Sequence, residues 1–243
     1  MLTYKINATQ STNSYLKELV KKIGAEEEIV VVTNNQTNGR GQVGAIWQSQ
    51  VGKSLTFSVF KPGFGMDVSH QFFISMAVSL AVKDVLHLRN VVNLCVKWPN
   101  DILSANKKIC GILIENILQK SVIAGSVIGI GLNVNENLFE NLPKATSMKI
   151  VTGKNFSLEE ILEDVVKSLD FYFVFLKEKR VGELAELYIS ALYGKDQVNF
   201  FLTPDGLRFH GIIRSIAPNG KLRVEMENKS IKEFDLKEIT LIY

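Results

Sequence analysis

Apolar residues recur along this chain at two spacings, and the spacing changes from one segment to the next. In four segments they recur every three or four positions, the period of an amphipathic helix, and these segments cover residues 15–23, 67–88, 158–175 and 181–192. Helix-capping residues precede three of the segments: Ser11 to Asn13, Asp67 or Ser69, and Ser157 with Glu160 three positions later. Gly24 and Gly194 follow the first and last helices.

β-Branched and aromatic residues cluster in shorter segments between these helices and predict strands. The predicted strands cover residues 28–33, 53–60, 91–97, 102–104, 108–117 and 122–134. The last of them is nearly continuous apolar and contains three glycines, which is typical of a central strand buried on both faces.

From Lys195 onward the pattern changes to short strands separated by turn signals. The strands cover residues 198–202, 208–216, 221–226 and 230–235, and the turns lie at 204–206, 218–220 and 227–229. We therefore predict two domains, a large one over residues 1–194 and a small all-β one over residues 195–243.

Composition narrows the class of protein. A hydrophobic content of 46% supports a substantial core, and a net charge of +3 does not indicate the clustered basic surface of a nucleic-acid-binding protein. We find no apolar run long enough to cross a bilayer and no signal-peptide core, so we expect a cytoplasmic protein without a membrane partner. Cys95 and Cys110 lie in apolar strand segments and are expected to be buried thiols.

Three closely spaced glycines, Gly39, Gly41 and Gly44, lie between two predicted strands, with Arg40 inside the group and Trp47 just after it. Such glycines expose backbone N–H groups that bind anions, and an arginine adds donors that match a carboxylate or phosphate. The spacing also fits a dinucleotide-binding fingerprint, but residues 45–52 lack the helical stripe which that fingerprint requires. A plain surface turn remains the alternative.

Two further segments allow both a structural and a functional interpretation. Lys97 ends a predicted strand where Trp98 and Pro99 interrupt it, so its amine either projects into a site at the strand end or is an ordinary solvated charge. Ser11 to Asn13 either only cap the first helix or also offer a ligand the free N–H groups of a helix N-terminus.

Taken together, five motifs resemble those of the biotin protein ligase family, in that family's order and spacing. They are Ser11 to Asn13, Gln36 to Trp47, Lys97 to Asp101, Lys108 to Glu115 and Gly129 to Asn135. The resemblance implies an α+β fold like that of class II synthetases, with a mixed central sheet, flanking helices and a small C-terminal SH3-like β-barrel.

The resemblance also implies the activity of a biotin–[biotin carboxyl-carrier protein] ligase. Biotin and ATP, with Mg²⁺ on the triphosphate, form biotinyl-5′-adenylate, and biotin is transferred to a lysine of the carrier domain of a biotin-dependent carboxylase. The implied catalytic residues are Lys97 and Arg40. The implied biotin-binding residues are Ser11, Thr12, Asn13, Gln36, Gly39, Arg40, Gly41, Gln42, Lys97, Gly111, Gly129 and Gly131. The implied ATP- or adenylate-binding residues are Arg40, Trp47, Lys97, Asn100 and Asn133, and no residue is assigned as a metal ligand.

The glycine–arginine segment departs from the family pattern Gly-Arg-Gly-Arg-x-Gly-Arg, because Gln42 and Ala45 replace the second and third arginines. This departure bears on how tightly the adenylate is retained. Only ten residues precede Ser11, so we expect no N-terminal DNA-binding domain and no DNA partner.

Two alternative functions stay open. Lipoate protein ligases share the fold and the adenylate chemistry, although their Arg-Arg-x-x-Gly-Gly-Gly loop is absent here. A non-catalytic biotin-binding domain is the second alternative, against which the presence of Lys97 and Arg40 argues. Monomer and homodimer both stay open, since an edge strand would allow two subunits to pair.

Overall fold

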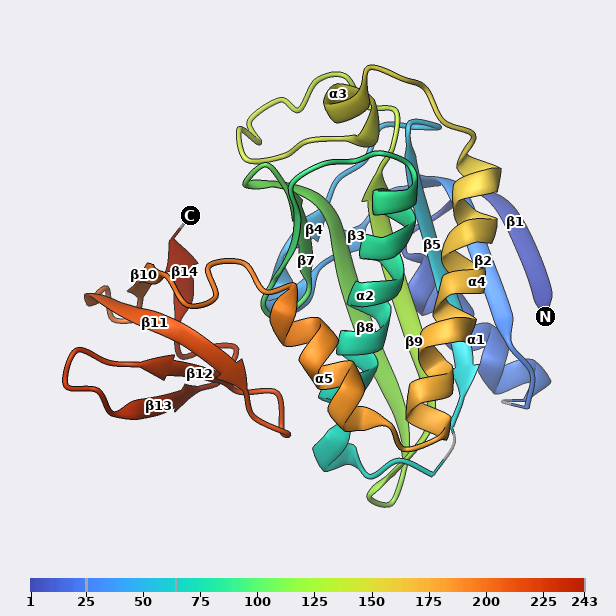
Figure 1. Cartoon of the computed structure of the whole chain (residues 1–243). Coiled ribbons are helices and arrows are strands. Elements are labelled where there is room, and N and C mark those ends of the chain that lie inside the picture. The colour runs from blue at the N-terminus through green and yellow to red at the C-terminus, as the bar shows by residue number, and fades with distance from the viewer. Residues whose placement is uncertain (25, 64, 243) are drawn as a thin grey trace.

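The computed structural model describes residues 1–24, 26–63 and 65–242, and its larger part is built on a mixed seven-stranded sheet (Figure 1). The strands lie in the order β1 (Leu2–Thr9), β2 (Ile29–Gln36), β5 (Ser54–Pro62), β9 (Val122–Asn133), β8 (Lys107–Gln119), β7 (Asp101–Ser104) and β6 (Leu94–Lys97). Only the β1–β2 pair of this sheet is parallel among the described residues. The predicted apolar strand, β9, is the fourth of the seven, which confirms its central position.

Helices cover both faces of this sheet. Helices α2 (Phe72–Leu88), α4 (Leu158–Lys177) and α5 (Val181–Ser190) lie together on one face (Figure 1), while α1 (Thr12–Ile23) packs on the other. Successive side chains of β2 point to opposite faces of the sheet. Val30 packs in the core under α2, whereas Ile29 and Val31 pack in the cluster under α1. A short helix, α3 (Met148–Thr152), lies in the connection after β9.

The C-terminal part forms a separate antiparallel sheet of five strands. Their order is β13 (Ile231–Phe234), β12 (Leu222–Glu225), β11 (Arg208–Ile216), β10 (Val198–Leu202) and β14 (Thr240–Ile242). This sheet packs on the larger part through the turn that contains Gly220. The indole Nε1 of Trp98 donates a hydrogen bond of 2.9 Å to the Gly220 carbonyl, and the ring of Phe72 lies against the same glycine.

The four predicted helices are confirmed as α1, α2, α4 and α5, whereas the short helix α3 was not predicted. Local chemistry explains where the predicted helices begin. Ser11 and Ser157 cap α1 and α4 as expected. Asp67 caps a single 3₁₀ turn, η2 (Val68–His70), so that α2 itself begins a few residues later. Strand β6 starts at Leu94 rather than at residue 91, because a turn at residues 89–90 follows α2 and the chain bends at Asn93, which has positive φ.

The stretch Val68–Leu88 is, by length and composition alone, long and apolar enough to cross a membrane, whereas the sequence analysis found no such run. In the described structure 61% of that window is buried, as in the core helix of a soluble protein.

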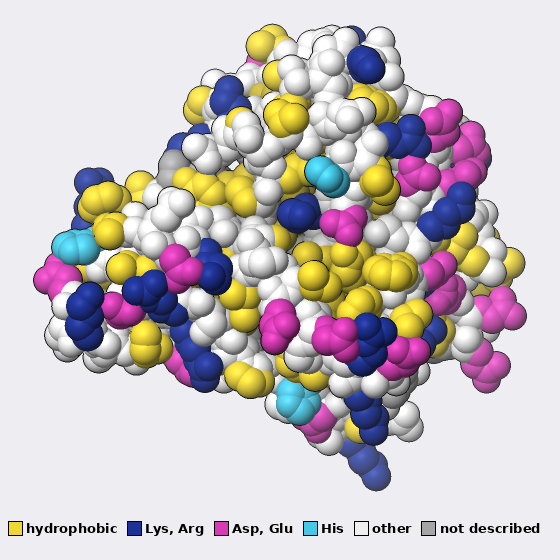
Figure 2. Space-filling view, viewed as in Figure 1, with side chains coloured by type: hydrophobic (Ala, Val, Ile, Leu, Met, Phe, Trp, Pro, Cys, Tyr) yellow, Lys and Arg dark blue, Asp and Glu magenta, His cyan; other side chains and the backbone are white. Residues whose placement is uncertain are grey.

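On the face that carries α2, α4 and α5, basic and acidic side chains are interspersed (Figure 2). Both cysteines are free thiols, with Cys110 buried and Cys95 partly exposed.

Candidate functional site

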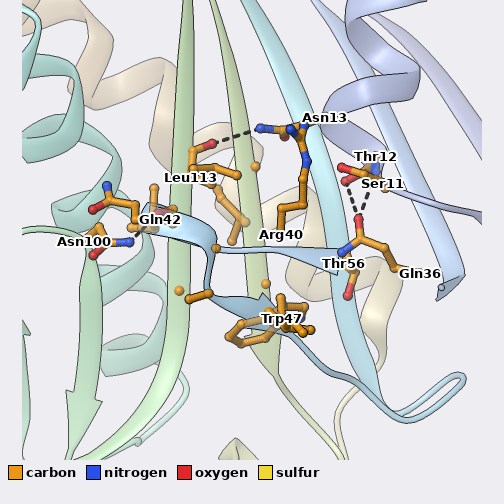
Figure 3. Close-up of a pocket in the computed structure, with 18 of the residues that line it drawn as sticks. Ser11, Thr12, Asn13, Gln36, Arg40, Gln42, Trp47, Thr56, Asn100 and Leu113 are labelled. Carbon is orange, nitrogen blue, oxygen red and sulfur yellow. Dashed lines mark hydrogen bonds between the residues drawn. The ribbon is translucent and has the colours of Figure 1, made fainter. Parts of the chain in front are cut away.

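A cavity of about 210 Å³ lies on the α1 face of the large sheet, beyond the N-terminus of that helix (Figure 3). Along β9 the side chain of Val127 packs under α1, and the next two residues on the same face are Gly129 and Gly131. Because these positions carry no side chain, Asn13 and the Trp47 ring can approach the sheet closely there. The cavity is lined by Ser11, Thr12, Asn13, Gln36, Arg40, Gly41, Gln42, Ala45, Ile46, Trp47, Thr56, Phe57, Asn100, Asp101, Lys108, Gly111, Ile112, Leu113, Gly129, Ile130 and Gly131.

The glycines of this wall are needed for close packing. A Cβ atom on Gly129 would lie 2.4 Å from Asn13 Oδ1, and one on Gly131 would lie 2.3 Å from the Trp47 ring. Gly111 pairs with Gly131 in the register of β8 and β9 and also faces the Trp47 ring. The three glycines therefore form a flat wall that runs from Asn13 to the indole.

Polar side chains form one end of the cavity. Thr12 donates its backbone N–H to Gln36 Oε1 at 2.9 Å, and Ser58 Oγ lies 2.7 Å from Thr12 Oγ1 and 2.6 Å from Asn13 Oδ1. Thr12 and Asn13 are each only 3% exposed. Ser11 is the helix cap, since its Oγ accepts from the backbone N–H of Ser14, and it also lines the cavity. The capping interpretation is therefore confirmed, whereas ligand binding by this segment stays a prediction. The backbone N–H groups of Thr12 and Ser14 are paired with Gln36 and Ser11.

The glycine–arginine segment forms a small hairpin over the cavity. Strand β3 (Gly39–Arg40) pairs with β4 (Ile46–Trp47), and a 3₁₀ turn, η1 (Gln42–Gly44), joins them. No α-helix follows the glycines, in agreement with rejection of the dinucleotide fingerprint. A Cβ on Gly39 would lie 2.3 Å from the Trp47 carbonyl oxygen, and Gly44 has φ of 80°, so both positions require glycine.

Two buried hydrogen-bond donors of the cavity lining lack a partner. Trp47 Nε1 and Thr56 Oγ1 have no hydrogen-bond partner among the described residues. Buried donors in folded proteins are almost always paired, so unpaired ones that line a cavity point to a ligand. Thr56 was missed by sequence reasoning, although alternation along the predicted strand 53–60 places it on the same face as Ser58.

Basic and acidic side chains form the other end of the cavity. Lys108 lines it, with Nζ 2.7 Å from Asp101 Oδ1 and 5.7 Å from the centre of the Trp47 ring. Lys97 is not among the described residues that line the cavity. Its Nζ lies 3.9 Å from Asp101 Oδ2. Burial lowers the pKa of Lys97, which the charge of Asp101 counteracts only in part. Sequence reasoning chose Lys97, although Lys108 stood in one of the quoted motifs.

Other predicted site residues occupy distinct places. Asn100 lines the cavity and donates from Nδ2 to the carbonyl of Ile112 at 2.7 Å. Asn133 is 4% exposed, donates to the carbonyl of Thr146 at 2.9 Å and lies outside the described lining. Gly39 borders an adjoining cavity of about 530 Å³ on the other side of the hairpin.

Arg40 lines both cavities and is held from two elements. Its Nη2 donates to Ser14 Oγ of α1 at 3.0 Å and to Glu115 Oε2 of β8 at 3.3 Å. The view in Figure 3 shows its side chain extending from the hairpin toward Asn13. Neither contact was expected from the sequence. In the part of the chain that the structure describes, no group of three His, Cys, Asp or Glu side chains is arranged to hold a metal.

Comparisons with known proteins agree with these motifs. The profile of the Biotin/lipoate A/B protein ligase family matches residues 6–133, more than half of the chain. The bifunctional ligase/repressor BirA of Bacillus subtilis is 30% identical over 161 residues, and the match spans 64% of this chain and 49% of that protein. The chain thus spans about half the length of this relative.

A biotin–[acetyl-CoA-carboxylase] ligase of Mycobacterium tuberculosis is 27% identical over 226 residues, which cover 92% of this chain and 83% of that protein. Among solved structures, the biotin protein ligase from Aquifex aeolicus in complex with biotin and ATP superposes with a TM-score of 0.82 at 26% identity. That superposition covers 99% of this chain and 98% of the other.

Proposed function

Because this chain belongs to the biotin/lipoate A/B protein ligase family, we propose that it is an ATP-dependent biotin protein ligase of the cytoplasm. Its substrates would be biotin, ATP and a lysine of a biotin carboxyl carrier domain. The observation that carries the proposal is a single cavity with a hydrogen-bonding end, a flat glycine wall and a cationic end.

The three regions match the parts of biotin in order. The ureido ring offers N–H donors and a carbonyl acceptor, and the paired side chains of Thr12, Asn13 and Gln36 supply complementary groups. The fused ring is apolar and fits beside the wall at Gly131, where the Trp47 ring also lies. The carboxylate end then points toward the charged groups of the cavity.

In the proposed first step, an oxygen of the biotin carboxylate attacks the α-phosphorus of ATP, and the bond from that phosphorus to the pyrophosphate oxygen breaks. Two anions must approach each other, so cations close to the reacting atoms lower the barrier. Lys108 supplies a positive charge at this end of the cavity, and Arg40 supplies guanidinium donors from the hairpin. Lys97 adds a second positive charge. Asp101 lies between the two lysines and partly offsets the charge of Lys97.

In the proposed second step, the uncharged amine of the acceptor lysine attacks the acyl carbon of biotinyl-5′-adenylate. The new amide bond forms, AMP leaves, and the lysine nitrogen loses a proton. Gly41 and Gln42 of the hairpin line both cavities, and the second cavity reaches Leu236, in the turn between β13 and β14. In this proposal the acceptor lysine reaches the adenylate through the second cavity.

The described residues fit Mg²⁺ only as an ion that the nucleotide brings with it. Asp101 is the carboxylate of the cavity lining, and it is paired with Lys108. Mg²⁺ commonly keeps several waters and binds one or two carboxylates together with substrate phosphates. When bound, the ion would neutralise charge on the triphosphate.

The test is pyrophosphate release by the purified chain with ATP and either biotin or lipoate, followed by mass spectrometry of an added carrier domain. We expect release with biotin and biotin attached to one lysine of the carrier. Pyrophosphate release with lipoate but not with biotin would assign the chain to the lipoate branch of the family. Tight biotin binding without pyrophosphate release would instead indicate a non-catalytic binding domain.

A further inference from the structure

Glu115 on β8 accepts hydrogen bonds from three side chains, two of helix α1 and one of strand β3. Its Oε1 accepts from Lys17 Nζ at 2.5 Å, and its Oε2 accepts from Asn13 Nδ2 at 2.8 Å and from Arg40 Nη2 at 3.3 Å. Its side chain is 22% exposed and borders the second cavity. One carboxylate therefore joins helix α1, the central sheet and the hairpin over the cavity.

The ionised form of this carboxylate is favoured. Burial alone would raise the pKa of Glu115, but the hydrogen bonds from Lys17 and Asn13 and the charges of Lys17 and Arg40 bring it below its ordinary value. The group is therefore an anion at neutral pH, and it attracts the guanidinium of Arg40.

The contact continues into the polar end of the cavity. Asn13, which donates to Glu115, also receives Ser58 Oγ at its own Oδ1, and Ser58 in turn contacts Thr12. Groups that face the proposed biotin ring are thus linked through one hydrogen-bonded chain to the arginine of the hairpin. Networks of this kind fix the orientation of their members.

Arg40 is held in a way that leaves donors available. All hydrogen bonds that the described residues make with its guanidinium use Nη2, through Ser14 and Glu115. The other guanidinium donors remain available to an anion in either adjoining cavity. Apart from the Trp47 ring, which packs on Gly131, the hairpin consists of two strands of two residues and several glycines, so its own backbone pairing gives it little rigidity.

We propose that Glu115 is a positioning residue, which tethers Arg40 through Nη2 and thereby holds the hairpin from Gly39 to Trp47 over the cavity. The guanidinium is oriented before the nucleotide arrives, so less ordering is left for the binding step. The consequence for ATP rests on the proposed function, whereas the tether itself does not.

The test compares Glu115→Gln with Lys17→Met. Glu115→Gln removes the charge that Arg40 contacts, and Lys17→Met removes only the partner on the opposite oxygen, so it is the matched control. Hydrogen exchange of the backbone amides in residues 38–47 is measured without ligand. We expect faster exchange in Glu115→Gln and unchanged exchange in Lys17→Met.

Steady-state pyrophosphate release supplies the second measurement. We expect Glu115→Gln to raise the KM for ATP roughly two- to fivefold, as for a partly exposed ion pair, with kcat and the Kd for biotin nearly unchanged. In an Arg40→Gln background, Glu115→Gln should change neither hairpin exchange nor the Kd for ATP any further. If Glu115 only stabilised the fold, Glu115→Gln would still accelerate hairpin exchange in the Arg40→Gln background.

Unchanged hairpin exchange in Glu115→Gln would overturn the proposal, and so would equal acceleration in Lys17→Met. If Glu115→Gln fails to fold, Arg40→Gln reports on the same tether from the hairpin side and must accelerate exchange. Absence of biotin-dependent pyrophosphate release in the wild type would refute the proposed function, while the exchange comparison would still decide the role of Glu115.

Discussion

Replacement of Lys108 by methionine tests which lysine supplies the charge for adenylate formation. The substitution keeps most of the apolar stem of Lys108 and removes the ammonium group, which lies 5.7 Å from the centre of the Trp47 ring. Lys108 lines the cavity, whereas Lys97 reaches the same carboxylate, Asp101, from outside the described lining. The family resemblance assigned the catalytic charge to Lys97, so the two variants distinguish the alternatives.

The expected magnitude follows from this geometry. Loss of a single group aimed at developing charge commonly lowers kcat by about 10²–10³-fold, and we expect this for Lys108→Met. For Lys97→Met we expect a loss of only about tenfold, since a charge that acts through a neighbouring carboxylate has a weaker effect on the transition state. Lys107→Met is the control, because Lys107 is an exposed neighbour outside the cavity lining.

The assay is single-turnover pyrophosphate release, with biotin affinity measured separately by titration calorimetry. Biotin affinity should remain within roughly threefold of wild type in Lys108→Met, because an interaction made mainly in the transition state affects kcat. The reasoning is refuted if Lys108→Met turns over normally while Lys97→Met loses the larger factor. That result would return the catalytic charge to the residue implied by the sequence.

Three further outcomes are expected. Trp98→Phe should leave the carbonyl of Gly220 without its donor, costing about 1–3 kcal/mol and lowering Tm by roughly 2–12 °C in calorimetry; an unchanged Tm would show that water replaces the indole. Because burial lowers the pKa of Lys97 below 10.5, the unfolded chain binds more protons as pH approaches that value. The free energy of unfolding from urea titrations should therefore rise with pH in this window and lose that rise in Lys97→Met. Gln42→Arg should slow dissociation of biotinyl-adenylate roughly 10- to 150-fold in a rapid-dilution assay, through a new charge-assisted hydrogen bond; an equal rate would indicate that backbone groups and hairpin closure hold the adenylate.

Helices and central strands could be predicted because their signals are local. Helix α4 combines an apolar stripe with a capping serine, and β9 combines apolar residues with glycines. Strand β1 was not predicted, although its apolar residues alternate with polar ones and Tyr4 and Ile6 pack against the cluster under α1. It is an edge strand whose side chains are exposed or half-buried, so its alternation is the only local signal that it carries. Strand β14 has only three residues, too few for a pattern to be recognised.

The members of the cavity could largely be predicted, but their partners could not. Asn133 follows Gly131 on the same face of β9, which made a ligand contact reasonable. However, the connection after β9 folds back, and the carbonyl of Thr146 takes the Asn133 amide. The contact between Asn13 and Glu115 joins residues 102 positions apart in sequence. Period and spacing report which face a residue occupies, whereas its partner depends on how distant segments pack.

The proposed division at Gly194 shows the same limit at the scale of domains. The change of pattern there is real, since the strands before and after it belong to different sheets. Yet one hydrophobic cluster contains both Phe72 of α2 and Phe201 of β10, and Trp98 donates across the division to Gly220. Trp98 directly follows Lys97 and precedes Asn100, so the C-terminal sheet packs against the segment that supplies part of the site. A change in this packing therefore has a direct structural route to the cavity, and the C-terminal sheet supports the segment that supplies part of the site.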